Sequence, residues 1–230
     1  MPWIKSGFRA FIPSLTWQVA PQVAELVRRQ PSSARILDLG AGGRLIDNRV
    51  IGVDFQPFPN TRVVADIETL PFASASIDLI IATGLLEHVR NVETTIREFH
   101  RVLKPGGLLH VEVPFLQQYH DDPIDCRRFT RPGLVLFLEQ NGFSSQKSGC
   151  HIGPTVAWIT LTAYYLALWF EGPSLVSRIL SNAVFLILSI ALFPLKYLDK
   201  LLLGRTNGHR LAFGVFCTAT RSSTDHSSPR

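Results

Sequence analysis

Short apolar runs alternate with amphipathic segments through the first two thirds of the chain. Five runs are dominated by Val, Ile, Leu and Ala and are bounded by Gly, Pro or Asp. They are residues 35–39, 50–53, 63–65, 79–82 and 108–113. Runs of this kind are typical of parallel strands that are buried on both faces of a sheet. We therefore predict a mostly parallel sheet at the centre of the fold.

Amphipathic helices are predicted between and after these strands. In residues 92–103 the apolar positions recur at helical spacing, and the segment ends at Lys-Pro-Gly-Gly, residues 104–107. A second helix is expected at 132–140, before an Asn-Gly turn and a further strand near Phe143. Strands that alternate with helices in this way indicate a doubly wound α/β fold.

The chain is expected to form one α/β domain with additions at three places. The domain is predicted over residues 34–151 and 208–220, and the second part contains the last strand. Residues 1–33 are expected to form an N-terminal helical segment, with a helix from about 17 to 29 that packs on the core. Contact of this segment with a lipid surface is the alternative. The Ser-rich tail, residues 221–230, is expected to be disordered.

Residues 152–207 are expected to form an apolar helical insertion before the last strand. Two stretches in it, 155–170 and 179–195, contain no charged residue. Helices that are apolar on every side are buried in a core or in lipid. Each stretch is shorter than the roughly 20 residues that span a bilayer, so a shallow helical hairpin at the membrane surface is favoured. A dimer interface or a lid over a hydrophobic substrate pocket is the alternative.

Composition and charge narrow the functional classes. Hydrophobic residues make up 46% of the 230 residues and charged residues 18%, which favours a folded chain over a disordered one. The net charge is +5, but the basic residues are spread along the chain, so no nucleic-acid partner is expected. The three cysteines lie far apart without a Cys-x-x-Cys spacing. This spacing predicts neither a metal site nor a disulfide framework, and it suits the reducing cytoplasm.

The first strand runs into a glycine-rich turn. Asp38 is followed by Leu-Gly-Ala-Gly-Gly, residues 39–43, and glycines at the carboxyl end of a strand let a ligand approach the backbone closely. A dinucleotide-binding turn needs a further Gly or Ala where this chain has Leu45, which disfavours a nicotinamide-dependent oxidoreductase.

Asp54 ends the second strand, where a carboxylate can accept both hydroxyls of a ribose. A turn or helix-capping role for Asp54 is the alternative.

Five motifs follow one another in a characteristic order: ILDLGAGG, VIGVD, VVADIETLPF, SIDLIIATGLLEHV and EFHRVLKPGGLLHVEVPF. In this order they resemble the class I S-adenosylmethionine-dependent methyltransferases, in particular their small-molecule branch and a bacterial subset with a shortened first helix. The resemblance covers about residues 35–143, roughly half of the chain. It implies a seven-stranded, Rossmann-like sheet and S-adenosylmethionine as the cofactor.

The resemblance also implies a cofactor site. The glycine turn would contact the methionine part, Asp54 and its neighbour Phe55 the ribose side, and residues 83–85 the sulfonium. Asp66 would accept from the adenine amine and Ile67 would cover the ring, although a solvated loop carboxylate is the alternative for Asp66. The implied cofactor-binding residues are Asp38, Gly40, Ala41, Gly42, Asp54, Phe55, Asp66, Ile67, Thr83, Gly84 and Leu85. One departure is that residues 43–50 are too few for the helix that normally follows the turn.

The segment after the fifth strand is the predicted acceptor site. Its sequence HDDPIDCRRFT, residues 120–130, resembles a segment of the bacterial subset that is often found in surface-polysaccharide and lipid-linked pathways. His120 is the first candidate for a general base and Asp121 the second, with a purely structural role for His120 as the alternative. Arg127 and Arg128 are predicted to bind a carboxylate or phosphate of the acceptor, or to pair with neighbouring aspartates.

These observations predict transfer of a methyl group to an oxygen or nitrogen atom of a small, glycan or lipid-linked acceptor. A non-catalytic cofactor-binding module in a membrane-associated complex is the alternative. The expected location is the cytoplasmic face of the membrane, with contact through residues 155–203, or the cytoplasm. No metal is expected, and His88 is predicted to support the structure rather than the reaction.

Overall fold

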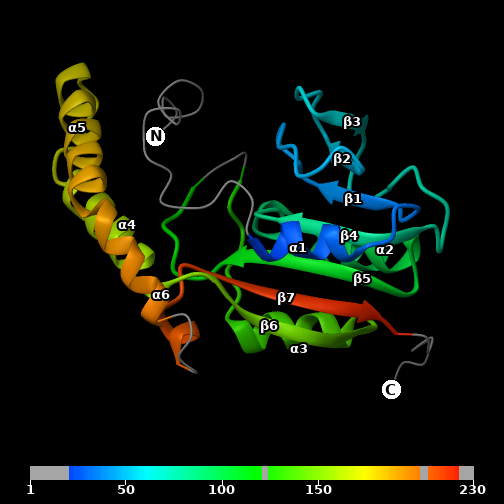
Figure 1. Cartoon of the computed structure of the whole chain (residues 1–230). Helices are drawn as coiled ribbons and strands as arrows, with labels where there is room; N and C mark the ends of the chain where they lie inside the picture. Colours follow the sequence, from blue (N-terminus) through cyan, green and yellow to red (C-terminus); the bar gives the residue numbers. More distant parts are fainter. Residues whose placement is uncertain (1–20, 121–123, 203–206, 223–230) are drawn as a thin grey trace. The chain divides into compact units, whose positions relative to one another are not determined.

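A computed structural model describes residues 21–120, 124–202 and 207–222 (Figure 1). The chain divides into two compact units, which are described separately below. Among the described residues, an α/β unit comprises 21–115, 120, 124–151 and 215–222. A helical unit comprises 116–119, 152–202 and 207–214. The tail predicted to be disordered over residues 221–230 begins too early, because Arg221 still belongs to a strand. Residues 223–230 and the first residues of the predicted N-terminal helix lie outside the described residues.

Seven strands form one sheet in the order β3-β2-β1-β4-β5-β7-β6. The strands are β1 (Ile36–Leu39), β2 (Val50–Asp54), β3 (Thr61–Val64), β4 (Ile77–Thr83), β5 (Leu103–Pro114), β6 (Phe143–Ile152) and β7 (Gly214–Arg221). The five strands from β3 to β5 pair in parallel, and β7 runs antiparallel to them (Figure 1). The doubly wound, mostly parallel seven-stranded sheet that the sequence predicts is confirmed.

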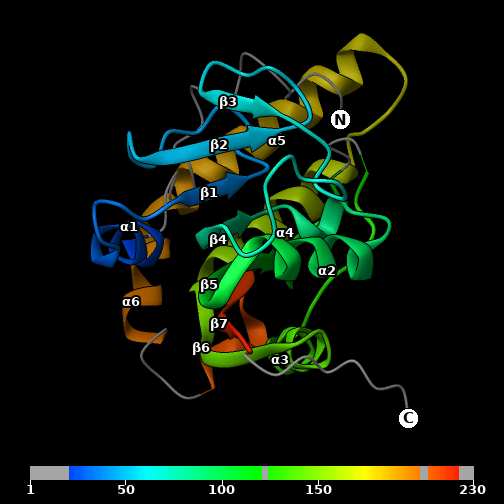
Figure 2. The same cartoon turned by 90° about the vertical axis from the view of Figure 1, so that its right-hand side faces the viewer.

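Three α-helices cover the sheet in the described part of the α/β unit. They are α1 (Pro21–Arg29), α2 (Val92–Val102) and α3 (Arg131–Gln140). Figure 2 shows α1 on one face of the sheet and α2 and α3 on the other. Val23 and Val27 of α1 pack against Ile36 of β1, and Ile96 and Phe99 of α2 are fully buried. Burial of side chains of this size contributes about 1.5–3 kcal/mol each, so these two apolar faces fix the helices to the sheet.

The boundary between α2 and β5 differs from the prediction, whereas the segment between β1 and β2 agrees with it. The chain leaves α2 one residue earlier than predicted, because Leu103 adopts an extended conformation and begins β5. The Lys-Pro-Gly-Gly segment, expected as a turn before a strand at 108, therefore belongs to β5 itself. Between β1 and β2 the structure has turns and bends in place of a helix, as the short spacing predicts. The turn of the predicted ligand site thus leads directly into the second strand.

A buried polar network crosses the centre of the α/β unit. Glu112 of β5 is 2% exposed, and its Oε1 accepts from Gln22 Nε2 at 2.7 Å and lies 3.1 Å from His110 Nε2. Burial alone would raise the pKa of Glu112, but the His110 hydrogen bond and the charge of nearby His151 outweigh it and lower the pKa to about 2. Burial lowers the pKa of His151. The network therefore holds Glu112 in its charged form.

Acid is expected to weaken the α/β unit through Glu112. Because its pKa is lower in the folded state, the carboxylate stabilises the fold above its ordinary pKa of about 4.5, and this contribution is lost as the pH falls toward 2. The urea midpoints of wild type and Glu112→Gln, measured from pH 6 to pH 3, should therefore converge as the pH falls. A gap between the two midpoints that stays constant over this range would contradict the assignment.

The helical unit is built on a hairpin of two apolar helices. It contains α4 (Pro154–Leu168), α5 (Leu175–Leu192), the 3-10 helices η3 (Phe193–Leu198) and η4 (Gly208–Leu211), and the short α6 (Asp199–Leu202). Small and hydroxyl-bearing side chains are buried along the two long helices, namely Thr160, Ala163 and Ala167 on α4 and Ser181 and Ser189 on α5. Small residues let two helices approach closely, as they do in membrane proteins. The predicted pair of apolar helices is confirmed.

Asp199 joins the two ends of this hairpin. Its carboxylate accepts from the backbone N–H groups of Thr155 at 2.8 Å and Val156 at 3.2 Å, in the first turn of α4. A Cβ atom at Gly153 would lie only 2.3 Å from Asp199 Cγ, so glycine is required there. Asp199 is 5% exposed. Through these two hydrogen bonds it caps the N-terminus of α4, although it lies far from α4 in the sequence.

Loss of this cap is expected to destabilise the helical unit. Asp199→Ala should lower its free energy of unfolding by about 1–2 kcal/mol, because two N–H groups lose their acceptor. Urea unfolding in mild detergent, followed by tryptophan fluorescence to which Trp158 of α4 contributes, measures the change. Glu171→Ala removes an exposed carboxylate between α4 and α5 and should leave the midpoint unchanged. Equal midpoints for Asp199→Ala and wild type would show that the cap is not stabilising.

Candidate active site

A cavity of about 780 Å³ opens where the first strands of the α/β unit end. Gly40 follows β1, Asp54 ends β2, Val64 ends β3 and Gly84 follows β4, and all four line the cavity. The carboxyl ends of parallel strands are the usual place for ligands in open α/β sheets. The volume lies within the range of small-molecule and cofactor sites.

The glycine turn has a backbone conformation that leaves room for a ligand. Gly40 and Gly42 have φ angles of +66° and +54°, which side chains other than glycine rarely adopt. A Cβ atom at Gly40 would lie 2.8 Å from Leu85 Cδ1. The turn is tied to β2, because the N–H of Gly40 donates to the carbonyl of Val53 at 2.9 Å. The backbone is thus held open on the side that faces the cavity.

Two buried carboxylates, those of Asp38 and Asp54, accept hydrogen bonds from residues in the glycine turn or directly after it. Asp38, 1% exposed, accepts from Arg44 Nε at 3.1 Å and from its Nη2 at 2.5 Å. Burial raises the pKa of Asp38, and the ion pair with Arg44 opposes the rise. Asp54 accepts from the N–H of Gly42 at 2.9 Å and from that of Gln56 at 3.2 Å. The Asp54 carboxylate therefore stabilises the glycine turn and also lines the cavity.

The structure brings most of the predicted cofactor residues to this cavity. The lining includes Gly40, Gly42, Asp54, Phe55, Asp66, Ile67, Gly84 and Leu85. Asp38 and Ala41 are buried and Thr83 ends β4, and none of these three is among the lining residues. Phe55 is 61% exposed at the rim. The lining also contains residues that the sequence analysis did not name as binding residues, including Phe58, His88, Arg90 and Asn91.

Glu87 and His88 lie in the short helix η2 (Leu86–His88), directly after β4. Glu87 is 2% exposed and its Oε2 has no hydrogen-bond partner among the described residues. Burial raises the pKa of Glu87 to about 7, although nearby His88 and Arg128 favour the charged form. His88 lines the cavity, and its Nδ1 lies 2.5 Å from the carbonyl oxygen of Ile124. His88, which the sequence predicts to be structural, thus contacts the backbone of a neighbouring segment and also lines the cavity.

The predicted acceptor segment packs beside η2. The ring of His120 meets that of His88 edge-on, with 5.0 Å between the ring centroids. Asp125 accepts from the backbone N–H of His120 at 2.9 Å and pairs with Arg128. Burial tends to raise the pKa of Asp125, but these hydrogen bonds outweigh it and lower the pKa. Arg127 donates to the carbonyls of Val89 and Arg90 at 3.1 and 2.9 Å.

The two arginines therefore have partners within the chain. The pairing of an arginine with a neighbouring aspartate, which the sequence analysis kept open, is the arrangement of Arg128. Contact of Arg127 or Arg128 with an acceptor stays a prediction, as does a base role for His120. Asp121, the second candidate base, lies outside the described residues.

The sheet order and the cavity together define the class of the α/β unit. Seven strands with an antiparallel β7, and a ligand cavity over a glycine turn after β1, are the architecture of a Rossmann-like class I methyltransferase. Residues 37–111 match the family described as a methyltransferase domain. This part of the chain is a class I S-adenosylmethionine-dependent methyltransferase domain, and S-adenosylmethionine is the cofactor of that class.

Known proteins resemble the chain over this domain. Over 91 residues it is 34% identical to malonyl-[acyl-carrier protein] O-methyltransferase 1 of Coxiella burnetii, covering 36% of this chain and 32% of that protein. Over 105 residues it is 30% identical to the mitochondrial ubiquinone biosynthesis O-methyltransferase of Rattus norvegicus, covering 35% and 30%. The chain thus spans about a third of the length of these curated relatives.

The fold is also that of solved methyltransferases. The 1,6-didemethyltoxoflavin-N1-methyltransferase of Burkholderia thailandensis was solved with 1,6-didemethyltoxoflavin and S-adenosylhomocysteine bound. It aligns with a TM-score of 0.52 at 17% identity, covering 88% of this chain and 76% of that one. At this identity the likeness concerns the fold alone.

Proposed function

We propose that the chain transfers a methyl group from S-adenosylmethionine to an oxygen or nitrogen atom of a small, glycan or lipid-linked acceptor. The observation that carries the proposal is the position of Asp54. Its carboxylate lies between the open glycine turn and the loop with Asp66 and Ile67, on the lining of one cavity. A carboxylate at this position suits the two hydroxyls of a ribose.

The residues of the cavity fit the cofactor. The glycine backbone at Gly40 and Gly42 leaves room for the methionine part, and a side chain at Gly40 would collide with Leu85, another lining residue of the cavity. Asp66 offers an acceptor for the exocyclic amine of adenine, and Ile67 an apolar surface for the ring. When bound, S-adenosylmethionine supplies an electrophilic methyl group on a positively charged sulfur.

The contribution of the chain's own residues is alignment and removal of a proton. In-line placement of the acceptor atom lowers the barrier mainly by removing the entropic cost of orientation. An attacking hydroxyl or amine also loses a proton. His88 lines the cavity, and Glu87 and His120 adjoin it, so this cluster is where we place that proton transfer. His120 keeps the role of first candidate base, with Glu87 as a further group of suitable pKa.

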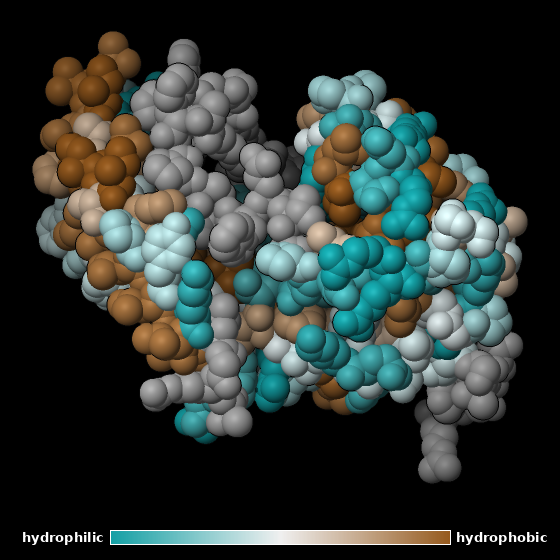
Figure 3. All heavy atoms as spheres, in the orientation of Figure 1, coloured by the Kyte–Doolittle hydropathy of each residue, from teal (hydrophilic) through white to brown (hydrophobic). Residues whose placement is uncertain are grey.

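We further propose that the helical unit rests in a membrane surface at the cytoplasmic side. Large apolar side chains of the hairpin are strongly exposed, including Trp169 at 74%, Val176 at 73% and Ile187 at 63%. Brown atoms dominate the surface over α5 in Figure 3. The helical stretch Leu175–Leu202 is long and apolar enough to cross a membrane, and only 17% of its most apolar window is buried. Such a patch on a soluble surface is unfavourable without a covering partner.

The connections of the chain favour a hairpin over a single crossing. β6 precedes the helical unit and β7 follows it, and both strands belong to the same sheet. The chain therefore enters and leaves the lipid on one side. Lys196 and Lys200 lie over the ring of Tyr197, at 5.4 and 5.3 Å from its centroid, a combination suited to headgroup depth. A lipid-linked acceptor is the substrate class that such a location favours.

The proposed activity is tested by methyl transfer to natural acceptors. Purified protein, labelled S-adenosylmethionine and separate lipid, glycan and small-molecule extracts are incubated, and the products are analysed by mass spectrometry. We expect a labelled product heavier by one methyl group in the lipid or glycan extract, and none with Asp54→Ala. Binding of S-adenosylhomocysteine without transfer in any extract would favour the non-catalytic cofactor-binding module instead.

A further inference from the structure

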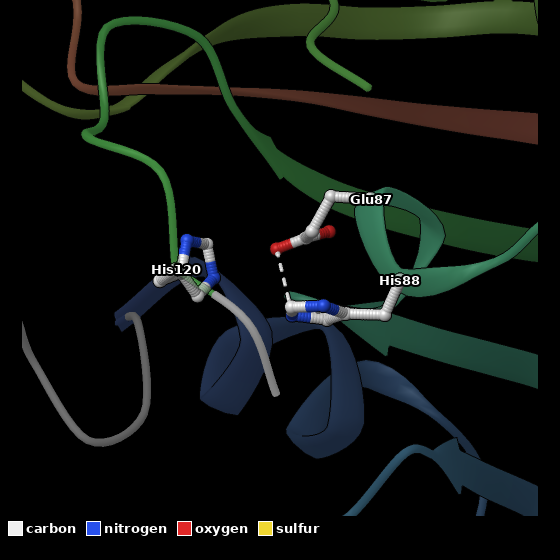
Figure 4. Close-up of side chains that lie close together, drawn as sticks. All are labelled: Glu87, His88 and His120. Carbon is white, nitrogen blue, oxygen red and sulfur yellow. Dashed lines mark ion pairs between the residues drawn. The ribbon is translucent and has the colours of Figure 1, made fainter. Parts of the chain in front are cut away.

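We propose that Glu87, His88 and His120 form a binding site for a divalent transition-metal ion such as Zn²⁺, beside the cofactor cavity. One possible ligand atom from each of the three side chains lies within 4.8 Å of the other two. Figure 4 shows the three side chains converging from η2 and from the loop that carries His120. The cysteine and histidine spacing of the sequence gave no sign of this site, because its residues come from segments more than 30 positions apart.

The donor set indicates the kind of ion. Two imidazoles and one carboxylate suit zinc and related transition metals, whereas magnesium and calcium prefer oxygen ligands alone. Three protein ligands leave a fourth position open, as in catalytic sites. Around an ion with bonds of about 2.0–2.2 Å, tetrahedral ligand atoms lie about 3.4 Å apart, so the three groups would draw together by up to about 1.4 Å. His120 lies in a loop, where such a movement is readily accommodated.

Glu87 supplies independent evidence for a cation. The side chain is 2% exposed, and its Oε2 has no hydrogen-bond partner among residues 21–120, 124–202 and 207–222. Buried carboxylate oxygens are nearly always paired, because the loss of hydration is costly. Its other oxygen lies 3.8 Å from His88 Nε2, which is too long for a hydrogen bond. A metal ion between these atoms would satisfy both groups.

Both histidines have the second contact that is typical of metal ligands. A histidine that binds a metal through one ring nitrogen usually donates the other N–H to a carbonyl or a carboxylate. His88 Nδ1 lies 2.5 Å from the carbonyl of Ile124, which can only accept. His120 Nδ1 lies 3.2 Å from Oδ2 of Asp125, which Arg128 holds in place. In the tautomer that both contacts favour, the lone pair is on Nε2.

The site would act on the acceptor. His88 and Ile124 line the cavity, so the open position of the ion adjoins the substrate. A hydroxyl acceptor bound there would release its proton to solvent more readily. Its oxygen would then form the bond to the methyl carbon as the carbon–sulfur bond breaks and its electron pair stays on sulfur. With the ion bound, His120 is a metal ligand and no longer the general base. This role rests on the proposed methyl transfer, whereas binding of the ion does not.

Cobalt binding to the full chain tests the site without any methyl transfer. Protein without a histidine tag is stripped with a chelator and titrated with Co²⁺, and bound zinc is quantified by elemental analysis after dialysis. We expect one equivalent of Co²⁺ with the visible absorption of a four-coordinate or five-coordinate nitrogen and oxygen site. His120→Ala and the near-isosteric Glu87→Gln should each weaken binding by at least about 10-fold.

Two control variants and one independent readout make the result decisive. His209→Ala removes a histidine of the helical unit, and Cys126→Ser removes a thiol near η2, and both should bind Co²⁺ as wild type does. Binding of S-adenosylhomocysteine shows that each variant is folded. Wild type that binds S-adenosylhomocysteine but no Co²⁺, or Co²⁺ affinity unchanged in His120→Ala or Glu87→Gln, would overturn the metal site and leave the proposed function standing. Co²⁺ binding without methyl transfer would support the site alone.

Discussion

Replacing Asp54 with alanine is expected to weaken binding of S-adenosylhomocysteine by about 100-fold or more. The carboxylate is predicted to accept from both ribose hydroxyls, and a hydrogen bond to a charged group contributes about 1.5–3 kcal/mol. The substitution also removes the acceptor of the Gly42 N–H, which helps to hold the turn open. Titration calorimetry with S-adenosylhomocysteine measures the change directly.

A matched control separates this effect from general damage. Asp47 lies between β1 and β2, and its carboxylate accepts from the N–H of Arg49 at 2.8 Å, outside the cavity. Asp47→Ala should therefore bind S-adenosylhomocysteine as wild type does. Asp66→Asn is expected to cause a smaller loss than Asp54→Ala, because only one adenine contact changes. Affinity of Asp54→Ala within threefold of wild type would show that the ribose is not bound at this residue.

Two glutamates on the exposed side of α5 are expected to release the protein from membranes. Ile179 and Ile187 are 59% and 63% exposed, so Ile179→Glu combined with Ile187→Glu should leave the hairpin folded. A buried negative charge in lipid costs several kcal/mol, and the effect is smaller near the headgroups. We expect the share of protein that floats with phosphatidylcholine and phosphatidylglycerol vesicles to fall by about 10-fold or more.

The control for this experiment is an apolar residue of the other unit. Leu136 of α3 is 56% exposed, and Leu136→Glu should float with vesicles as wild type does. Flotation of the double variant at the wild-type level would contradict the lipid contact. A wild type that does not float but forms a dimer, with a double variant that is monomeric in sedimentation, would identify the hairpin as an interface between subunits.

The sheet and the glycine turn were predictable because their signals are local. A strand that is buried on both faces is a continuous apolar run, and the carboxyl ends of such strands meet in parallel sheets. The motifs after β1, β2 and β3 therefore predict Gly40, Asp54 and Asp66, and all three line the cavity. The boundary at Leu103 was missed, because an apolar residue fits a helix face and a strand equally well.

Features that depend on distant contacts could not be read from the sequence. Glu87 follows two leucines and precedes His88 in a motif, but its burial and its position near His120 depend on how a distant segment packs in the fold. Asp199 caps a helix that begins 45 residues earlier in the chain. The sequence left open whether Arg127 and Arg128 bind an acceptor or pair within the chain, and the loop conformation sets which partners they have in the fold.

The most direct test of this account is a crystal structure of the chain with S-adenosylhomocysteine. The account predicts the ribose hydroxyls within hydrogen-bond distance of the Asp54 carboxylate, the adenine beside Asp66 and Ile67, and the sulfur near Leu85. A ligand bound elsewhere, or a cavity filled by neighbouring side chains between Gly40 and Asp54, would contradict it.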